Sequence, residues 1–184
     1  MSKRALILID IQNDYFADGK WPLAGMHTAA ANAARVLAAA RAAGDKVIHV
    51  RHEFEAEDAP FFAPGSDGAR THASVLPQAD EAVVLKHQVN AFLGTDLKAQ
   101  LDAAAIEQVT LVGAMSHMCI AAAARASTEM SSSRAKRPPL IAGVRSSCGS
   151  SARGQRMGAG RSMPSGERRR LQVVLGRVEV EPEQ

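Results

Sequence analysis

The chain has 184 residues, of which 46% are hydrophobic and 22% charged, and this length and apolar content suffice for the core of one domain. The composition excludes disorder of the whole chain, and no apolar run approaches the roughly 20 residues that a membrane-spanning helix needs. The short apolar stretch near the N-terminus ends at Asp10, so it is not a signal peptide, and two cysteines are too few for a disulfide scaffold, which indicates a cytoplasmic protein.

The formal charge of +3 conceals a strong contrast along the chain. Residues 1–130 contain 11 Lys and Arg against 15 Asp and Glu, whereas residues 131–184 contain 11 Lys and Arg against 4 Glu. Because a basic tail can bind an anionic partner, a catalytically silent module with an anion-binding tail is one alternative. The tail has no aromatic residue that could stack on bases, so we do not expect a nucleic-acid partner.

The first half of the chain predicts two strands, a helix and a long loop. Residues 5–11 (ALILIDI) are a short apolar run, typical of a strand buried on both faces. The Ala-rich residues 26–43 predict a helix, which a Gly-Asp pair ends before a second strand over 46–50. Residues 52–77 are rich in acids, Gly and Pro and predict a long loop over one end of a sheet, and such loops are more often functional than not.

Strands and helices continue to alternate up to residue 130. Strands are predicted over residues 82–85 and 108–112, and helices over 96–105 and 119–130. This alternation predicts the α/β class, a three-layer α/β/α domain with a mostly parallel, Rossmann-like central sheet. In such sheets ligands bind beyond the carboxyl ends of the strands.

Beyond residue 130 the pattern breaks down. Residues 131–170 contain nine Ser and nine Arg with one short apolar run, and apolar periodicity returns at 171–180, which predicts a strand. We therefore interpret residues 1–184 as a single domain with a regular core over 1–130 and an atypical tail over 131–184.

Three candidate catalytic groups follow strand ends. Asp10 closes the first strand, Lys86 follows the third, and Cys119 lies between the fourth strand and its helix. The dipole and the free N–H groups of a helix N-terminus stabilise a thiolate and can hold an oxyanion. Plainer interpretations are a small buried residue for Cys119, a cap or metal ligand for Asp10 and a solvated charge for Lys86. Together the three supply a nucleophile, a proton acceptor and a charge stabiliser.

Signals for metal and substrate binding are weaker. His49 and His52 lie three residues apart on a strand that leads into a loop, so they do not share a face, and no HExxH or CxxC spacing occurs. We therefore expect neither a metal site nor a cofactor. The scarce aromatic side chains adjoin the edge where the three candidates meet, and core packing is the alternative interpretation of each. The substrate-binding candidates are Phe16, Trp21, Phe61, Phe92 and His117.

Three segments carry a resemblance to a known family. They are LILIDIQNDYF at 6–16, VVLKHQVNAFLGTDL at 83–97 and LVGAMSHMCIAAAARAS at 111–127. In order, spacing and catalytic residues they resemble the isochorismatase-like cysteine hydrolase superfamily, and the resemblance covers residues 1 to about 130.

By this resemblance, Asp10, Lys86 and Cys119 would form the Asp–Lys–Cys triad of the amidase branch. Cys119 would attack the carbonyl of a small amide or ureido substrate, Asp10 would pass the thiol proton to departing ammonia, and hydrolysis of the thioester would complete the cycle. The family's non-proline cis peptide would join Ala114 and Met115, in an oxyanion hole of Ala114, Met115 and Cys119. The family also implies a homodimer or homotetramer.

Two branches of the family are alternatives. Isochorismatases cleave a vinyl ether without a cysteine nucleophile, so Cys119 favours the amidohydrolase branch. Nicotinamidases carry zinc on an Asp-x-His pair after the second strand, whereas residues 51–54 here read RHEF. We therefore expect no zinc site, and we do not expect nicotinamide to be the substrate.

The tail over 131–184 matches nothing in the family. Arg- and Ser-rich sequence almost without acids is typical of a shifted reading frame in a GC-rich gene. Our hypothesis is that this tail is a frameshift or a misassigned sequence, and peptide mapping of the purified protein tests it.

Overall fold

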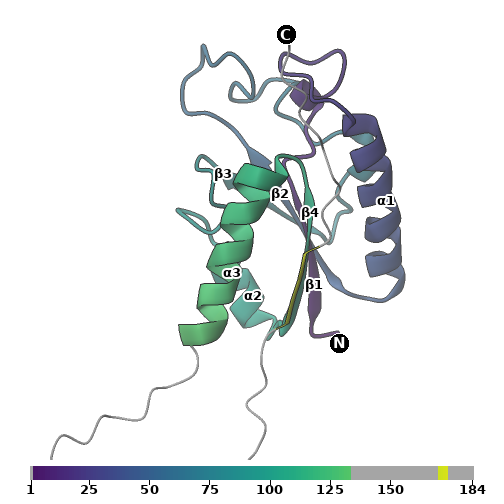
Figure 1. Ribbon diagram of the computed structural model, residues 1–184, viewed down its shortest axis with the longest axis vertical. Helices are drawn as coiled ribbons and strands as arrows, with labels where there is room; N and C mark the ends of the chain where they lie inside the picture. Colours follow the sequence, from purple (N-terminus) through teal and green to yellow (C-terminus); the bar gives the residue numbers. More distant parts are fainter. Residues whose placement is uncertain (1, 134–169, 174–184) are drawn as a thin grey trace, which may run out of the picture.

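A parallel β-sheet forms the centre of the molecule (Figure 1). The computed structural model of the chain describes residues 2–133 and 170–173. In this part of the chain five strands pair in the order β3-β2-β1-β4-β5, and every neighbouring pair is parallel. The strands are β1 (Arg4–Ile9), β2 (Lys46–His52), β3 (Ala82–Lys86), β4 (Gln108–Gly113) and β5 (Arg170–Val173).

The central strand β1 explains why its sequence is a continuous apolar run. It pairs with β2 on one side and β4 on the other, so that Ile9 lies beside both Val50 and Gly113. Leu6 and Leu8 belong to the core on one face of the sheet, and the side chains that alternate with them belong to the core on the other face. A strand covered on all sides needs apolar residues at every position.

Helices cover both faces of the sheet. Helix α1 (Met26–Ala42) packs on one face, whereas α2 (Leu97–Ala103) and α3 (Ala121–Ser133) lie on the other, as Figure 1 shows. The buried face of α1 consists largely of Ala with Leu37 and Met26, and these small side chains let the helix approach the strands closely. The three-layer α/β/α architecture with a parallel sheet is therefore confirmed.

The connections at the carboxyl ends of the strands contain the short helical turns. These are the 3₁₀ turns η1 (Asn13–Tyr15) and η2 (Ala73–Val75) and the π-helix η3 (Ser116–Ile120). The last predicted helix, over 119–130, is thus a single π-helical turn followed by α3. Residues 53–81 form the predicted long loop between β2 and β3.

Residues 134–169 and 174–184 lie outside the described residues, so the hypothesis about the tail and most of the strand predicted over 171–180 are not tested. Of that predicted strand the structure describes residues 171–173, which belong to β5 and pair with β4. No helix in the described part of the chain has the length and apolar character needed to cross a membrane.

Candidate active site

The structure brings together the three groups that the sequence singles out. Asp10 directly follows β1, Lys86 is the last residue of β3, and Cys119 lies in η3 after β4. The Lys86 Nζ atom lies 2.9 Å from Oδ2 of Asp10 and 3.5 Å from Sγ of Cys119. The Lys86 and Asp10 side chains are 0% and 1% exposed. An ammonium, a carboxylate and a thiol therefore meet out of contact with bulk water.

The backbone around this site adopts conformations that residues other than glycine rarely take. Asp10 has a φ of 55° while its N–H donates to the carbonyl of Val50 at 3.0 Å, and Met115 has a φ of 57°. At Gly113, where φ is 153°, a Cβ atom would lie 2.0 Å from the carbonyl oxygen of Ile9. This close approach of β4 to β1 brings the turn that carries Cys119 beside Asp10. Such outliers are typical of segments that the surrounding structure holds in place at functional sites.

The electrostatics of the site keep the thiol protonated at rest. Burial, together with the negative charge of Asp10, raises the pKa of Cys119 to about 12, although the ammonium of Lys86 acts in the opposite direction. Besides its ion pair with Lys86, the Asp10 carboxylate forms a hydrogen bond with the Cys119 thiol, which also raises the pKa of that thiol. Its oxygens are therefore available to accept the thiol proton, and Cys119 needs such a base to become nucleophilic.

His52 is a fourth member of the site that sequence reasoning missed. In the register of the sheet it pairs directly with Lys86, and its Nδ1 lies 3.2 Å from Nζ of that lysine. Burial, and next the charge of Lys86, lower the pKa of His52 to about 4. Because an ammonium can only donate, the Nδ1 atom of the neutral ring accepts and Nε2 carries the proton. The signal in the sequence was its position, since β2 continues two residues beyond the apolar run and His52 shares a face with Val50.

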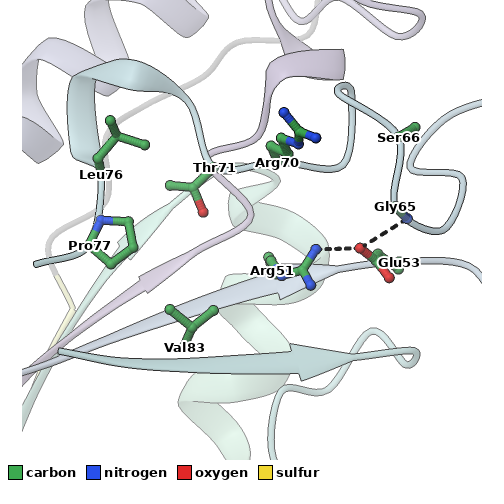
Figure 2. Close-up of a pocket in the computed structure, with 9 residues that line it drawn as sticks. All are labelled: Arg51, Glu53, Gly65, Ser66, Arg70, Thr71, Leu76, Pro77 and Val83. Atoms are coloured by element: carbon green, nitrogen blue, oxygen red, sulfur yellow. Dashed lines mark hydrogen bonds and ion pairs between the residues drawn. The ribbon is translucent and has the colours of Figure 1, made fainter. Parts of the chain in front are cut away.

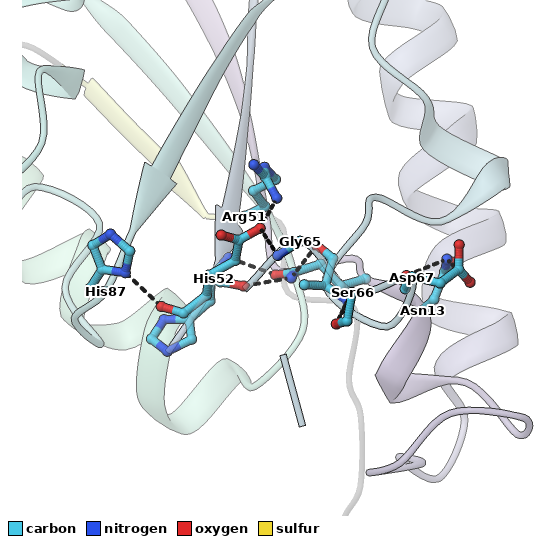
Figure 3. Close-up of polar contacts among 10 residues, drawn as sticks. Asn13, Arg51, His52, Gly65, Ser66, Asp67 and His87 are labelled. Atoms are coloured by element: carbon cyan, nitrogen blue, oxygen red, sulfur yellow. Dashed lines mark hydrogen bonds and ion pairs between the residues drawn. The ribbon is translucent and has the colours of Figure 1, made fainter. Parts of the chain in front are cut away.

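Gln12, a second missed residue, fixes the backbone of His52. Its side chain is fully buried, its Nε2 donates to the carbonyl of His52 at 2.8 Å, and its Oε1 accepts from the N–H of His52 at 2.7 Å. The same amide also donates to the carbonyl of Ala69. On the other side, the N–H of Glu53 donates to the carbonyl of Lys86 at 3.1 Å. Figure 3 shows His52 among these contacts, with His87 donating to the carbonyl of Glu53.

The expected cis peptide between Ala114 and Met115 is wrong for this structure, which has no cis peptide bond in its described residues. The left-handed conformation of Met115 makes the turn instead, without the roughly 3 kcal/mol that a non-proline cis bond costs. The N–H of Ala114 donates to the carbonyl of Ile9 at 3.0 Å, so it is not available to an oxyanion. Cys119 lies in η3 between Met118 and Ile120, whose N–H groups both donate to the carbonyl of Met115.

The aromatic candidates separate into two groups. The rings of Trp21 and Phe61 are in contact, with centroids 4.9 Å apart. Phe61 also packs against Phe54, whose ring centroid lies 4.8 Å from that of His52. An aromatic wall therefore runs from the half-exposed Trp21 to the contact with Lys86.

Two aromatic candidates lie away from this wall. Phe16 is buried and stacks on His72, and Phe92 packs against the core on the α2 and α3 face, so both have the core role that was the alternative interpretation. The side chain of His117 lies outside the described residues. Tyr15, which was not a candidate, packs on Phe62, and burial and the charge of Asp10 raise its pKa, so its phenol stays neutral.

In the part of the chain that the structure describes, no group of three or more His, Cys, Asp or Glu side chains is arranged to hold a metal ion. His49 lies on the opposite face of β2 from His52, and Nδ1 of His52 is already in contact with Lys86.

A separate pocket of about 420 Å³ opens on the opposite face of β2 from His52 (Figure 2). It contains none of the three candidate catalytic groups, and two of its lining residues, Arg51 of β2 and Glu53 just after that strand, pair with each other. Its lining residues are Arg51, Glu53, Gly65, Ser66, Arg70, Thr71, Leu76, Pro77 and Val83.

Comparison with known proteins agrees with this geometry. Residues 4–129 match the Isochorismatase domain family. The chain belongs to the isochorismatase family of hydrolases. It is 44% identical over 125 residues to the uncharacterized isochorismatase family protein YddQ of Bacillus subtilis, covering 68% of this chain and 69% of that protein.

Two further relatives of the isochorismatase family bear on the fold and on the chemistry. The crystal structure of a protein from Oleispira antarctica classed as an isochorismatase hydrolase superposes with a TM-score of 0.66 at 55% identity, covering 69% of this chain and 68% of that one. The maleamate amidohydrolase of Pseudomonas putida is 32% identical over 140 residues, covering 66% of this chain and 64% of that protein.

Proposed function

We propose that this isochorismatase-family protein is a cysteine-dependent hydrolase that cleaves a small amide or a related C–N bond through a thioester. The observation that carries the proposal is the position of the Lys86 ammonium, 2.9 Å from the Asp10 carboxylate and 3.5 Å from the Cys119 thiol. A buried thiol beside an acceptor with unfilled hydrogen-bonding positions is the arrangement that nucleophilic catalysis needs.

In the first half of the reaction, Asp10 takes the proton of the Cys119 thiol and the sulfur attacks the substrate carbonyl. Because the pKa of Cys119 is about 12, the resting thiol is protonated at neutral pH. Asp10 is therefore needed as the base that removes the proton when the sulfur attacks. The carbonyl oxygen becomes an oxyanion, and the family resemblance implies the N–H groups of Met115 and Cys119 as its donors. When the C–N bond breaks, the amine leaves with the proton that Asp10 held, and a thioester remains on Sγ.

In the second half, water replaces the amine. Asp10, again ionised, takes a proton from a water molecule, whose oxygen attacks the thioester carbonyl. Collapse of the second oxyanion releases the carboxylic acid and returns the proton to the sulfur. Lys86 remains an ammonium throughout and balances the negative charge, which moves between the carboxylate, the sulfur and the oxyanion.

The related maleamate amidohydrolase supports amide cleavage because its name describes hydrolysis of a C–N bond. Vinyl-ether hydrolysis needs no nucleophilic sulfur, so the contact between Lys86 and the Cys119 sulfur favours the amide reaction.

The test is ammonia release by the full chain from a panel of small primary amides and ureido compounds. Cys119→Ala should lose about 10³-fold or more in rate, as expected when a nucleophile is removed. Cys148→Ala removes the other cysteine and is the matched control, with activity unchanged. Mass spectrometry of the enzyme quenched during turnover should find the acyl group on the peptide that contains Cys119. Ammonia release that survives in Cys119→Ala would contradict the proposal.

A further inference from the structure

We propose that His52 is a positioning residue, whose Nδ1 atom accepts a hydrogen bond from Lys86 and so holds the ammonium between Asp10 and Cys119. The inference deepens the proposed function, because the lysine that it concerns is the one that balances charge in the proposed reaction. It rests on three features: the count of donors and acceptors at Lys86, the neutral state of the imidazole, and the way in which the His52 backbone is held.

The three N–H groups of the Lys86 ammonium have three acceptors around them. Nζ lies 2.9 Å from Asp10 Oδ2, 3.2 Å from His52 Nδ1 and 3.5 Å from Cys119 Sγ. An ammonium has three donors and no acceptor, so this environment matches it completely. Without the imidazole, one N–H of a fully buried ammonium would lose its partner, and an unpaired donor on a buried charged group is unfavourable. The ammonium would then turn, and its contact with the sulfur is the longest and weakest of the three.

The imidazole can do this only while it is uncharged. Burial and the charge of Lys86 lower the pKa of His52 to about 4, and the nearby His87 acts in the same direction, whereas Asp10 opposes them. The charged side chain of Arg51, its neighbour on β2, lines the pocket on the opposite face of the strand and pairs with Glu53 (Figure 2). His52 therefore remains an acceptor throughout the neutral and alkaline range.

The ring cannot easily move away from Lys86. Gln12 binds both the N–H and the carbonyl of His52, at 2.7 and 2.8 Å, so the backbone is fixed on both sides of the side chain. His52 also pairs with Lys86 in the parallel register, and the ring of Phe54 packs edge-on against the imidazole at 4.8 Å. A histidine that only filled space would not need its acceptor atom aimed at the ammonium.

The experiment measures how fast iodoacetamide alkylates Cys119 between about pH 6 and about pH 10. Since the pKa of this thiol lies above that range, the rate should rise about tenfold with each pH unit, and a change in the pKa displaces the whole profile. All variants carry Cys148→Ala, so that Cys119 is the reacting thiol. His52→Phe and His52→Leu remove the acceptor but keep an apolar side chain in the site. His52→Gln keeps an acceptor, and His27→Gln, on the exposed start of α1, is the matched control. Circular dichroism melting selects the variants that fold.

We expect the two apolar variants to alkylate about tenfold more slowly near neutral pH, with the thiol profile moved upward by about one pH unit, since a looser ammonium lowers the thiol pKa less. His52→Gln should stay within about twofold of the parent and His27→Gln should be unchanged. In amide hydrolysis the apolar variants should lose kcat with little change in KM, because Lys86 balances the charge that develops during the reaction and does not bind the substrate.

Alkylation of a folded apolar variant with the parental rate and profile would overturn the proposal. If neither apolar variant folds, His52→Gln decides alone: a folded protein with a tenfold slower thiol would overturn it, because the acceptor is retained. Alkylation needs no substrate, so its outcome is distinct from that of the Cys119→Ala test. Loss of the amidase proposal would leave the alkylation result standing, and the reverse also holds.

Discussion

Strand β2 carries two histidines, each next to a buried ion pair, and the two clusters differ in how fully their acids are bonded. On the α1 face, Glu81 accepts two hydrogen bonds from Arg41 at 2.7 Å each, one from the N–H of Gln78 at 2.8 Å, and lies 3.0 Å from Nε2 of His49. These contacts, led by the hydrogen bonds from Arg41, lower the pKa of Glu81 to about 2. An acid whose two oxygens already accept hydrogen bonds from Arg41 and Gln78 is held in its charged form and takes up a transferred proton poorly.

On the opposite face, Asp10 has one cation beside it, and its other hydrogen bond is with the Cys119 thiol. That cation, Lys86, is shared with a thiol and with His52. The comparison teaches that the donors around a carboxylate help to separate a structural acid from one that can take a proton. Glu81 accepts from Arg41 and Gln78 and holds the loop before β3 to α1, whereas Asp10 contacts the thiol and the ammonium of the candidate active site.

The largest effect should come from Lys86→Met, which leaves the Asp10 charge buried and unpaired. We expect loss of amide hydrolysis by about 10³-fold and a fall in the free energy of unfolding of about 3–5 kcal/mol. Urea unfolding and ammonia release measure the two. The double variant with Asp10→Asn should recover most of the stability and none of the activity. A stable and active Lys86→Met protein would remove the distinction between the clusters.

Glu81→Gln should have an intermediate effect that is confined to stability. We expect the free energy of unfolding to fall by about 1–3 kcal/mol at neutral pH, because the bonds from Arg41 lose their charged acceptor. Since the folded pKa of Glu81 lies near 2 and its ordinary value is 4.5, its contribution is present above pH 4.5 and is lost as the pH falls toward 2. Between pH 3 and pH 6 the free energy of unfolding, measured with urea, should therefore change less for the variant than for the parent. Asp102→Asn, in an exposed helix pair, is the control, and slower Cys119 alkylation in Glu81→Gln would contradict the comparison.

The smallest effect should come from His49→Leu. Glu81 keeps its bonds from Arg41 and Gln78, and the change removes the buried Nδ1 of His49, which has no hydrogen-bond partner among the described residues. We expect the free energy of unfolding to change by less than about 1 kcal/mol. Alkylation of Cys119 should remain at the parental rate, in contrast to His52→Leu three residues away. Equal effects of the two Leu substitutions on thiol reactivity would show that both histidines act only through packing.

Up to residue 130 the sequence predicted four strands and three helices, because burial on both faces leaves uninterrupted apolar runs such as residues 5–11. It placed the end of β2 too early because Arg51 and His52 are polar, although a strand continues as long as its neighbours supply hydrogen bonds. The π-helical form of η3 could not be predicted, since it depends on how the turn after Gly113 packs against β1.

Asp10, Lys86 and Cys119 could be grouped from the sequence because strand ends share one edge of a parallel sheet. His52 and Gln12 could not, since their contacts depend on the order of the strands. His52 meets Lys86 only because β2 and β3 are neighbours in register, and Gln12 reaches His52 only because β1 is the next strand along. The cis peptide came from the family resemblance, and the backbone of Met115 replaces it with a left-handed turn.

The central place of β1 has a consequence for incomplete chains. Asp10 and Cys119 come from opposite ends of the described core, so a nascent chain that stops before β4 contains the acid and the lysine but not the nucleophile. Such a chain also leaves one edge of β1 unpaired, although the last five residues of this strand are apolar and buried in the finished sheet. Exposed edges of this kind are templates for aggregation. Truncations between residues 87 and 107 should therefore be recovered as insoluble protein rather than as inactive, folded monomers.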